Sequence, residues 1–164
     1  MSTFEISLIF SALLCSLVAG LLFAYAIVVM PGIKKLNDKL FIKTFQITDR
    51  VIQNNDPVFL LVWVGSAVSI VVCAMSGFTT LQGVDFGLLI LATAGYLLGV
   101  QVTTVAIHLP LNSQLQKYDI DTMSEQELHA ARTAFETRWN RSNEIRTAIA
   151  CCVSFLLIML ALRQ

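Results

Sequence analysis

Four long apolar runs divide the sequence, and polar segments separate them. The runs cover residues 6–29, 58–75, 86–107 and 146–162, and their only charged residue is Arg146, at the first position of the last run. A helix needs about 20 predominantly apolar residues to cross a bilayer, and each run is close to that length. The pattern therefore predicts a single all-α domain, residues 1–164, built as a bundle of four transmembrane helices.

The polar segment after the first run has the pattern of an amphipathic helix. Residues 33–53 place apolar side chains on one face and basic side chains on another, which is typical of a helix that lies at the membrane surface. The apolar face holds Ile33, Leu36, Leu40, Ile47 and Val51, with Phe41, Phe45 and Ile52 beside it, and the basic stripe holds Lys35, Lys39, Lys43 and Arg50. We therefore expect an interfacial helix after the first span.

Prolines and a capping box predict where other helices begin and end. Pro31 and Pro110 are expected to end the first and third helices, because proline disfavours helical continuation. Ser124 and Glu127 form the pattern of a capping box, which predicts a helix start near residue 125. Neither Pro nor Gly occurs between residues 125 and 162, so we expect the fourth helix to carry a long cytoplasmic extension.

Lysine and arginine are distributed unevenly, although the charges balance overall. The chain has eleven Lys and Arg residues and eleven Asp and Glu residues. Ten of the eleven basic residues fall in segments 31–56 and 108–146. By the positive-inside rule these segments are cytoplasmic and both termini lie outside, as in an integral protein of the cytoplasmic (inner) membrane. With 56% hydrophobic and 13% charged residues, the composition excludes a soluble enzyme and disfavours a nucleic-acid partner. The lipid bilayer is the expected partner.

A polar stripe follows the predicted fourth helix towards the membrane. At 100° per residue, six side chains fall within an arc of about 80°: His129, Arg132, Glu136, Asn140, Asn143 and Thr147. The stripe either faces water beside the membrane or lines a pocket. Its two asparagines favour the pocket, because Asn is a mediocre helix former that adds little to a solvated face.

The motifs of several enzyme classes are missing. The chain has no phosphate loop, dinucleotide fingerprint, CxxC or HExxH, and residue 126, three before His129, is Gln rather than the Glu of a di-iron bundle. We therefore expect no metal, haem or other bound cofactor. The small-residue motif Gly95-xxx-Gly99 favours packing within the chain over dimerisation, although a homo-oligomer stays open.

Several polar stretches resemble the anthrone oxygenase-like family of small four-helix membrane proteins, long filed as a domain of unknown function. They are Val29–Gly32, Phe45–Phe59, His108–Asn112 and Trp139–Thr147, in matching order along nearly the whole chain. In this family, fungal members are linked to the oxidation of anthrones to anthraquinones with molecular oxygen, without an obvious bound cofactor. The resemblance implies ligand-binding roles for Asn112, Trp139, Asn140, Asn143 and Arg146, and more loosely for Gln46 and Asn54.

Two functions follow as hypotheses. The first is a cofactor-independent, oxygenase-like oxidoreductase that oxidises an aromatic or other hydrophobic carbon acid with O₂ at the cytoplasmic membrane face. His108 or Glu136 would be the base, and Asn112, Asn140, Asn143 and Arg146 would hold the oxyanion. The alternative is a non-catalytic membrane protein that binds a lipid or quinone-like ligand, or that scaffolds a partner.

Overall fold

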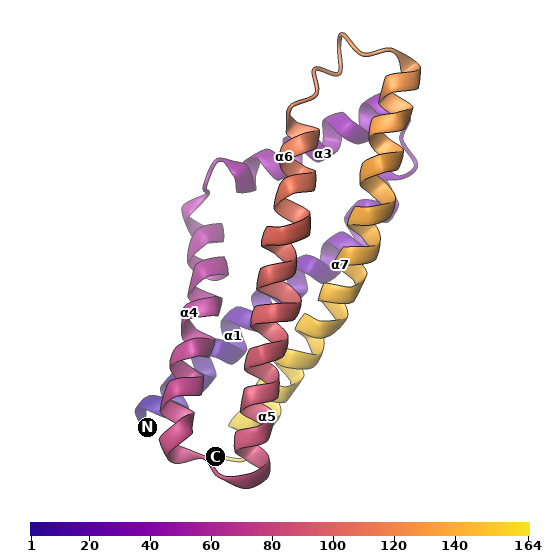
Figure 1. The fold of residues 1–164 in the computed structure, drawn as a ribbon. Helices are drawn as coiled ribbons and strands as arrows, with labels where there is room; N and C mark the ends of the chain where they lie inside the picture. Colours follow the sequence, from indigo (N-terminus) through magenta and orange to yellow (C-terminus); the bar gives the residue numbers. More distant parts are fainter.

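The computed structural model describes all of residues 1–164 and is entirely helical (Figure 1). Four continuous helices are long and apolar enough to cross a membrane: Thr3–Ile33, Pro57–Thr80, Gly83–Gln116 and Glu125–Ala161. The second is α4 and the fourth is α7, while the shorter helix α3 (Asp38–Gln53) crosses one end of the bundle. Both chain termini lie at the opposite end (Figure 1). The predicted all-α class with four membrane-spanning helices is confirmed.

Two of the long helices continue through the prolines that were expected to end them. The first consists of α1 (Thr3–Ala24), the π-helix η1 (Tyr25–Val29) and α2 (Met30–Ile33). The third consists of α5 (Gly83–Ala94), the π-helices η2 (Gly95–Val102) and η3 (Thr104–His108), and α6 (Leu109–Gln116). A π-helical turn stands immediately before each proline-containing turn. The first helix ends at Ile33, close to the end expected at Pro31 and Gly32. The expectation for Pro110 was wrong, because the third helix continues to Gln116 and the wider turn accommodates a residue that lacks an N–H and crowds the preceding carbonyls.

The membrane-spanning part has one apolar core, formed by α1, α4, the α5–η2 segment and α7. The Tyr96 hydroxyl donates to Ser66 Oγ at 2.6 Å inside this core. Gly99 allows a close approach to α7, because a Cβ there would lie 2.8 Å from Ile149 Cδ1. Packing of this glycine motif within the chain is therefore confirmed. Many large apolar side chains face outward along the spans, as a lipid-exposed surface requires.

The end of the bundle that α3 crosses contains most of the charged residues, and we call it the polar end (residues 30–57 and 107–146). A second apolar core lies inside it. Here Phe41, Ile42 and Phe45 of α3 are buried against α6 and α7. Leu40, Ile47 and Val51, the residues of α3 on the predicted apolar face, are 47–59% exposed and lie outside this core. The larger aromatic rings fill the space beside Phe135, so helix α3 has an inner and an outer apolar face.

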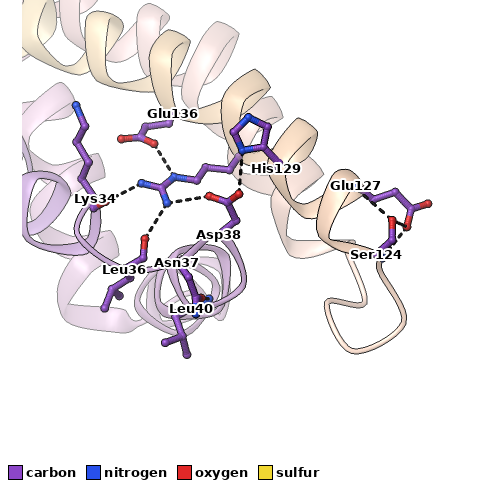
Figure 2. A network of polar contacts seen from close by, with 10 residues as sticks. Lys34, Leu36, Asn37, Asp38, Leu40, Ser124, Glu127, His129 and Glu136 are labelled. Carbon is purple, nitrogen blue, oxygen red and sulfur yellow. Dashed lines mark hydrogen bonds and ion pairs between the residues drawn. The ribbon is translucent and has the colours of Figure 1, made fainter.

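Polar contacts join the extension of α7, which carries His129 and Glu136, to the link between α2 and α3 at Lys34, Leu36 and Asp38 (Figure 2). Arg132 is the centre of these contacts. Its Nη1 donates to the Leu36 carbonyl at 2.9 Å and to Asp38 at 3.0 Å, while Nη2 donates to the Lys34 carbonyl at 2.8 Å. Its Nε donates to Glu136 at 2.8 Å. At the tip, Ser124 and Glu127 form the predicted capping box. These contacts fix the start of α3, and therefore the position of the side chains that follow on it.

Candidate functional site

A cavity of about 340 Å³ lies where the polar end meets the membrane-spanning bundle. The first helix, α3, the start of α4, the η3–α6 segment and α7 all contribute to its wall. Eleven of its 18 lining residues are hydrophobic, and its polar lining residues include Asp49, Gln53, Asn55, Thr104, His108, Asn112 and Arg146. Its size falls in the range of small-molecule sites, about 300–1,000 Å³, and mostly apolar walls with a few polar groups are typical of such sites.

One wall carries a chain of buried hydrogen bonds centred on Asn112 of α6. Its Nδ2 donates to Asp49 Oδ1 at 2.7 Å, and its Oδ1 accepts from Trp139 Nε1 at 2.9 Å. Asp49 Oδ2 also accepts from Gln116 at 3.1 Å and from Gln53 at 3.2 Å. The chain connects α3, α6 and α7, so three elements hold one another in register at the cavity.

Asp49 is a buried carboxylate without a basic partner. Only 2% of the residue is exposed, and no Lys, Arg or His lies within ion-pair distance. Burial raises the pKa of this carboxyl above its ordinary value, and the amide donors of Gln116, Gln53 and Asn112 oppose that rise. The carboxylate therefore depends on amide hydrogen bonds, rather than on a cation, for its stabilisation.

Arg146 of α7 brings a positive charge to the cavity without a carboxylate partner. The residue is 6% exposed, and its Nε donates to Asn143 Oδ1 at 3.0 Å while Nη1 donates to Thr104 Oγ1 at 2.9 Å. Its guanidinium lies 5.7 Å from the centre of the Trp139 ring. Because its partners are neutral, the guanidinium remains available to a negatively charged oxygen.

His108, at the end of η3, is the second unusual polar group of the lining. It is 2% exposed, and its Nε2 lies 3.0 Å from Ser142 Oγ. Its Nδ1 is buried without a hydrogen-bond partner, which is uncommon for a polar atom in a folded interior. The ring meets Trp139 edge-on at a centroid distance of 5.0 Å. With a proton on Nε2 donated to Ser142, Nδ1 carries an unused lone pair.

The structure brings four of the sequence-predicted residues together around the cavity: His108, Asn112, Trp139 and Arg146. Asn143 lies behind them, since its Oδ1 accepts from Arg146 and its Nδ2 donates to the Leu22 carbonyl at 3.2 Å. It therefore orients the guanidinium from outside the lining.

The other four predicted residues lie elsewhere. Glu136 pairs with Arg132, away from the cavity, and Asn140 lines a separate cavity of about 220 Å³ beside Lys34. Gln46 is buried and donates to the carbonyls of Leu115 and Tyr118 at 2.8 and 3.0 Å, which ties α3 to the end of α6. Asn54 is an exposed residue at the end of α3.

Asp49 is the main polar residue of the cavity that the sequence did not single out, and Tyr25 and Trp63 accompany it. One signal was available. Asp49 stands four residues after Phe45, and therefore on the aromatic side of α3 that turns inward. A carboxylate on an apolar helix face indicates a buried polar contact rather than a solvated one.

Comparisons with known proteins agree with this picture. A family model described as anthrone oxygenase matches residues 53–157, about two thirds of the chain. No curated protein and no solved structure matches this chain. The matched part contains His108, Asn112, Trp139 and Arg146, whereas Asp49 precedes it. The chain belongs to the anthrone oxygenase family.

Proposed function

We propose that this protein is an oxygenase that uses O₂ to oxidise an apolar aromatic carbon acid of the anthrone type, without a bound cofactor. The observation that carries the proposal is the pairing, in one apolar-walled cavity, of His108 with a free Nδ1 and Arg146 with no anionic partner. These are a proton acceptor and an oxyanion-binding group. Both groups favour removal of a proton from a CH₂ group that is conjugated with a carbonyl through aromatic rings, as in an anthrone.

The reaction begins with the transfer of a C–H proton to His108 Nδ1. The electron pair of that bond moves into the carbonyl, and the enolate oxygen is held by the Arg146 guanidinium. The enolate carbon then forms a C–O bond with O₂, and the resulting peroxide takes up a proton. Loss of the second C–H proton and of hydroxide breaks the O–O bond. One CH₂ group and one O₂ thus become one C=O group and one water.

His108 is a better proton acceptor in this geometry than Asp49. Both Asp49 oxygens already accept amide hydrogen bonds, whereas His108 Nδ1 has none. Glu136, the other base considered from the sequence, is held by Arg132 away from the cavity. In this proposal Asp49 holds Asn112, and Asn112 fixes the indole that forms one wall.

The rim of the cavity favours an apolar substrate that arrives from the bilayer. Leu60 of α4 and Val105 and Leu109 of the third long helix line the cavity and are 36–59% exposed. Such a rim gives the cavity an opening towards lipid between these two helices. A flat aromatic substrate dissolved in the membrane could therefore enter without crossing water.

The polar end is proposed to face the cytoplasm. Ten of the eleven basic residues lie there, which is the strongest topological signal in the chain. The substrate would then be oxidised at the cytoplasmic face of the membrane.

Oxygen uptake by the purified full-length protein with anthrone tests the proposal, with the protein-free rate subtracted. A His108→Gln variant should lose about 100-fold or more, the usual contribution of a general base. His129→Gln is the matched control, because His129 is the only other histidine and is exposed outside the cavity. An equal rate in the wild type and the His108 variant would refute the role of His108. Uptake no faster than the protein-free rate would refute the oxygenase.

The alternative function is binding of a quinone-like ligand without turnover, and the position of the tryptophans makes such binding measurable. Both tryptophans of the chain, Trp63 and Trp139, line the cavity. Anthraquinone that enters should therefore quench nearly all of the intrinsic fluorescence. Saturable quenching together with no oxygen uptake would favour the binding protein over the enzyme.

A further inference from the structure

A second groove, of about 590 Å³, lies on the outside of the bundle between α7 and the third long helix. It is open, and its lining includes Thr137, Arg138 and Arg141 of α7 together with the apolar Ile107 and Ile145. Ser142 separates it from the cavity described above, because this residue lines the groove while its Oγ contacts the cavity residue His108. The groove is therefore a different site from the cavity.

Three polar side chains of α7 in the groove have no partners within the chain, whereas the hydroxyls of Ser142 and Thr103 in the same lining contact His108 and the Leu98 carbonyl. Arg138 and Arg141 are exposed and form no ion pair or side-chain hydrogen bond, and the Thr137 hydroxyl is equally free. No Asp or Glu lines the groove. By contrast, Arg132 and Arg163 each contact a carboxylate. Two like charges three residues apart on a helix repel each other, so an anion bound between them relieves that repulsion.

Apolar residues lie directly below the two arginines. Ile145 is 54% exposed, and at 1.5 Å per residue it stands about 6 Å from Arg141 and about 10 Å from Arg138 along the helix axis. Phe155 of α7 and Val102 of η2 are also more than half exposed further into the span. The groove therefore joins a paired cationic site to a lipid-facing apolar surface within the height of one lipid headgroup.

We propose that this groove binds an anionic phospholipid. The phosphate is held by Arg138 and Arg141, with the Thr137 hydroxyl as an additional donor, and an acyl chain lies along Ile145. Basic pockets between transmembrane helices recognise lipid headgroups by this combination of charge and apolar surface. The two arginines, unpaired and free of acidic neighbours in the lining, select an anionic lipid over a zwitterionic one.

Native mass spectrometry of the full-length protein in mild detergent measures the binding, with dioleoyl phosphatidylglycerol as the probe and dioleoyl phosphatidylcholine as the neutral comparison. Arg138→Gln/Arg141→Gln is the test variant. Lys43→Gln/Arg50→Gln is the matched control, since it removes two exposed, unpaired bases from the same end of the molecule. At about 1 kcal/mol for each base, the test variant should bind phosphatidylglycerol roughly 30-fold more weakly, and each single variant roughly fivefold. The control should bind as the wild type does.

Equal loss in the test and control variants would overturn the proposal, because it would indicate general attraction to surface charge. Equal affinity of the wild type for the two lipids would overturn it as well. Displacement of phosphatidylglycerol by inorganic phosphate alone would show that the groove takes the free anion rather than the lipid. The single variants, Arg138→Gln and Arg141→Gln, decide the question if the double variant fails to fold.

Discussion

Replacement of Asn112 by leucine tests whether the hydrogen-bond chain holds the cavity together. Leucine has the same branched arrangement of four side-chain heavy atoms as asparagine, and is slightly larger, but it lacks both the donor and the acceptor. The Trp139 N–H then loses its partner, and Asp49 keeps only the donors of Gln53 and Gln116. Trp139 is 3% exposed and Asp49 is 2% exposed, so water does not replace the lost contacts without rearrangement.

The expected loss of stability follows from the two groups that lose a hydrogen-bond partner, the Trp139 N–H and the Asp49 carboxylate. A buried donor without a partner costs about 1–3 kcal/mol, and a hydrogen bond to a charged group contributes about 1.5–3 kcal/mol. The added apolar contacts of leucine offset about 1 kcal/mol of this loss in the free energy of unfolding. The net destabilisation should be about 3 kcal/mol. For a chain of this length, 1 kcal/mol lowers Tm by about 2–4 °C, so we expect a fall of about 6–12 °C.

Thermal unfolding in detergent micelles, followed by tryptophan fluorescence at pH 7, measures the change. Gln114→Leu is the matched control, because Gln114 lies on the same helix α6 and has only an exposed contact with the Tyr118 hydroxyl. That variant should unfold within about 2 °C of the wild type, since surface substitutions rarely exceed 0.5 kcal/mol. A Tm for Asn112→Leu equal to that of Gln114→Leu would refute the view that the chain of hydrogen bonds supports the cavity.

Three further predictions concern packing, the Arg132 network and pH. Gly99→Ala should destabilise by about 1–3 kcal/mol, because the added Cβ would meet Ile149, whereas Gly87→Ala, with open space at the Cβ, should be neutral or stabilising in the same unfolding assay. Arg132→Ala should lower Tm by several degrees and increase proteolysis between α2 and α3, and an unchanged digestion pattern would contradict its role as the anchor of that link. Because the folded-state pKa of Asp49 is raised, its contribution to stability is largest at acid pH, below its ordinary value of 3.8, and is lost as the pH rises through the folded-state pKa. The wild type should therefore lose stability relative to Asp49→Asn as the pH rises, so that the Tm of Asp49→Asn minus the Tm of the wild type increases from acid to neutral pH. A constant value of this difference would contradict the raised pKa.

The fold was largely predictable, because bilayer spanning imposes one strong constraint on the sequence. A span must be apolar and helical, so four apolar runs predict four helices whatever their contacts. The ends of the helices were harder to predict. Proline commonly ends a helix, and the first helix does end at Ile33, two residues after Pro31. The third helix continues past Pro110 to Gln116, because a π-helical turn precedes this proline. Only the backbone geometry reveals that accommodation.

The orientation of α3 could not be read from periodicity alone. The sequence places Leu40 and Ile47 on one apolar face of the helix, with Phe41 and Phe45 beside it. The packed face is the one with Phe41 and Phe45, because aromatic rings fill the gap between α6 and α7. The same packing turns Asp49 inward, and periodicity alone did not single out this carboxylate.

The two parts of the polar stripe on α7 make different contacts. The first part of the stripe, with Arg132 and Glu136, forms contacts with the α2–α3 link, and the second part, with Asn143, binds the end of α1 and orients Arg146. Neither alternative considered for the stripe, a face in water or the lining of a pocket, describes both parts. Arg146 and Trp139 lie on the neighbouring face of the same helix, and they line the cavity because the stripe fixes the rotation of α7. The stripe therefore acts by positioning, and a change at Asn143 should weaken ligand binding through Arg146 rather than through a contact of its own.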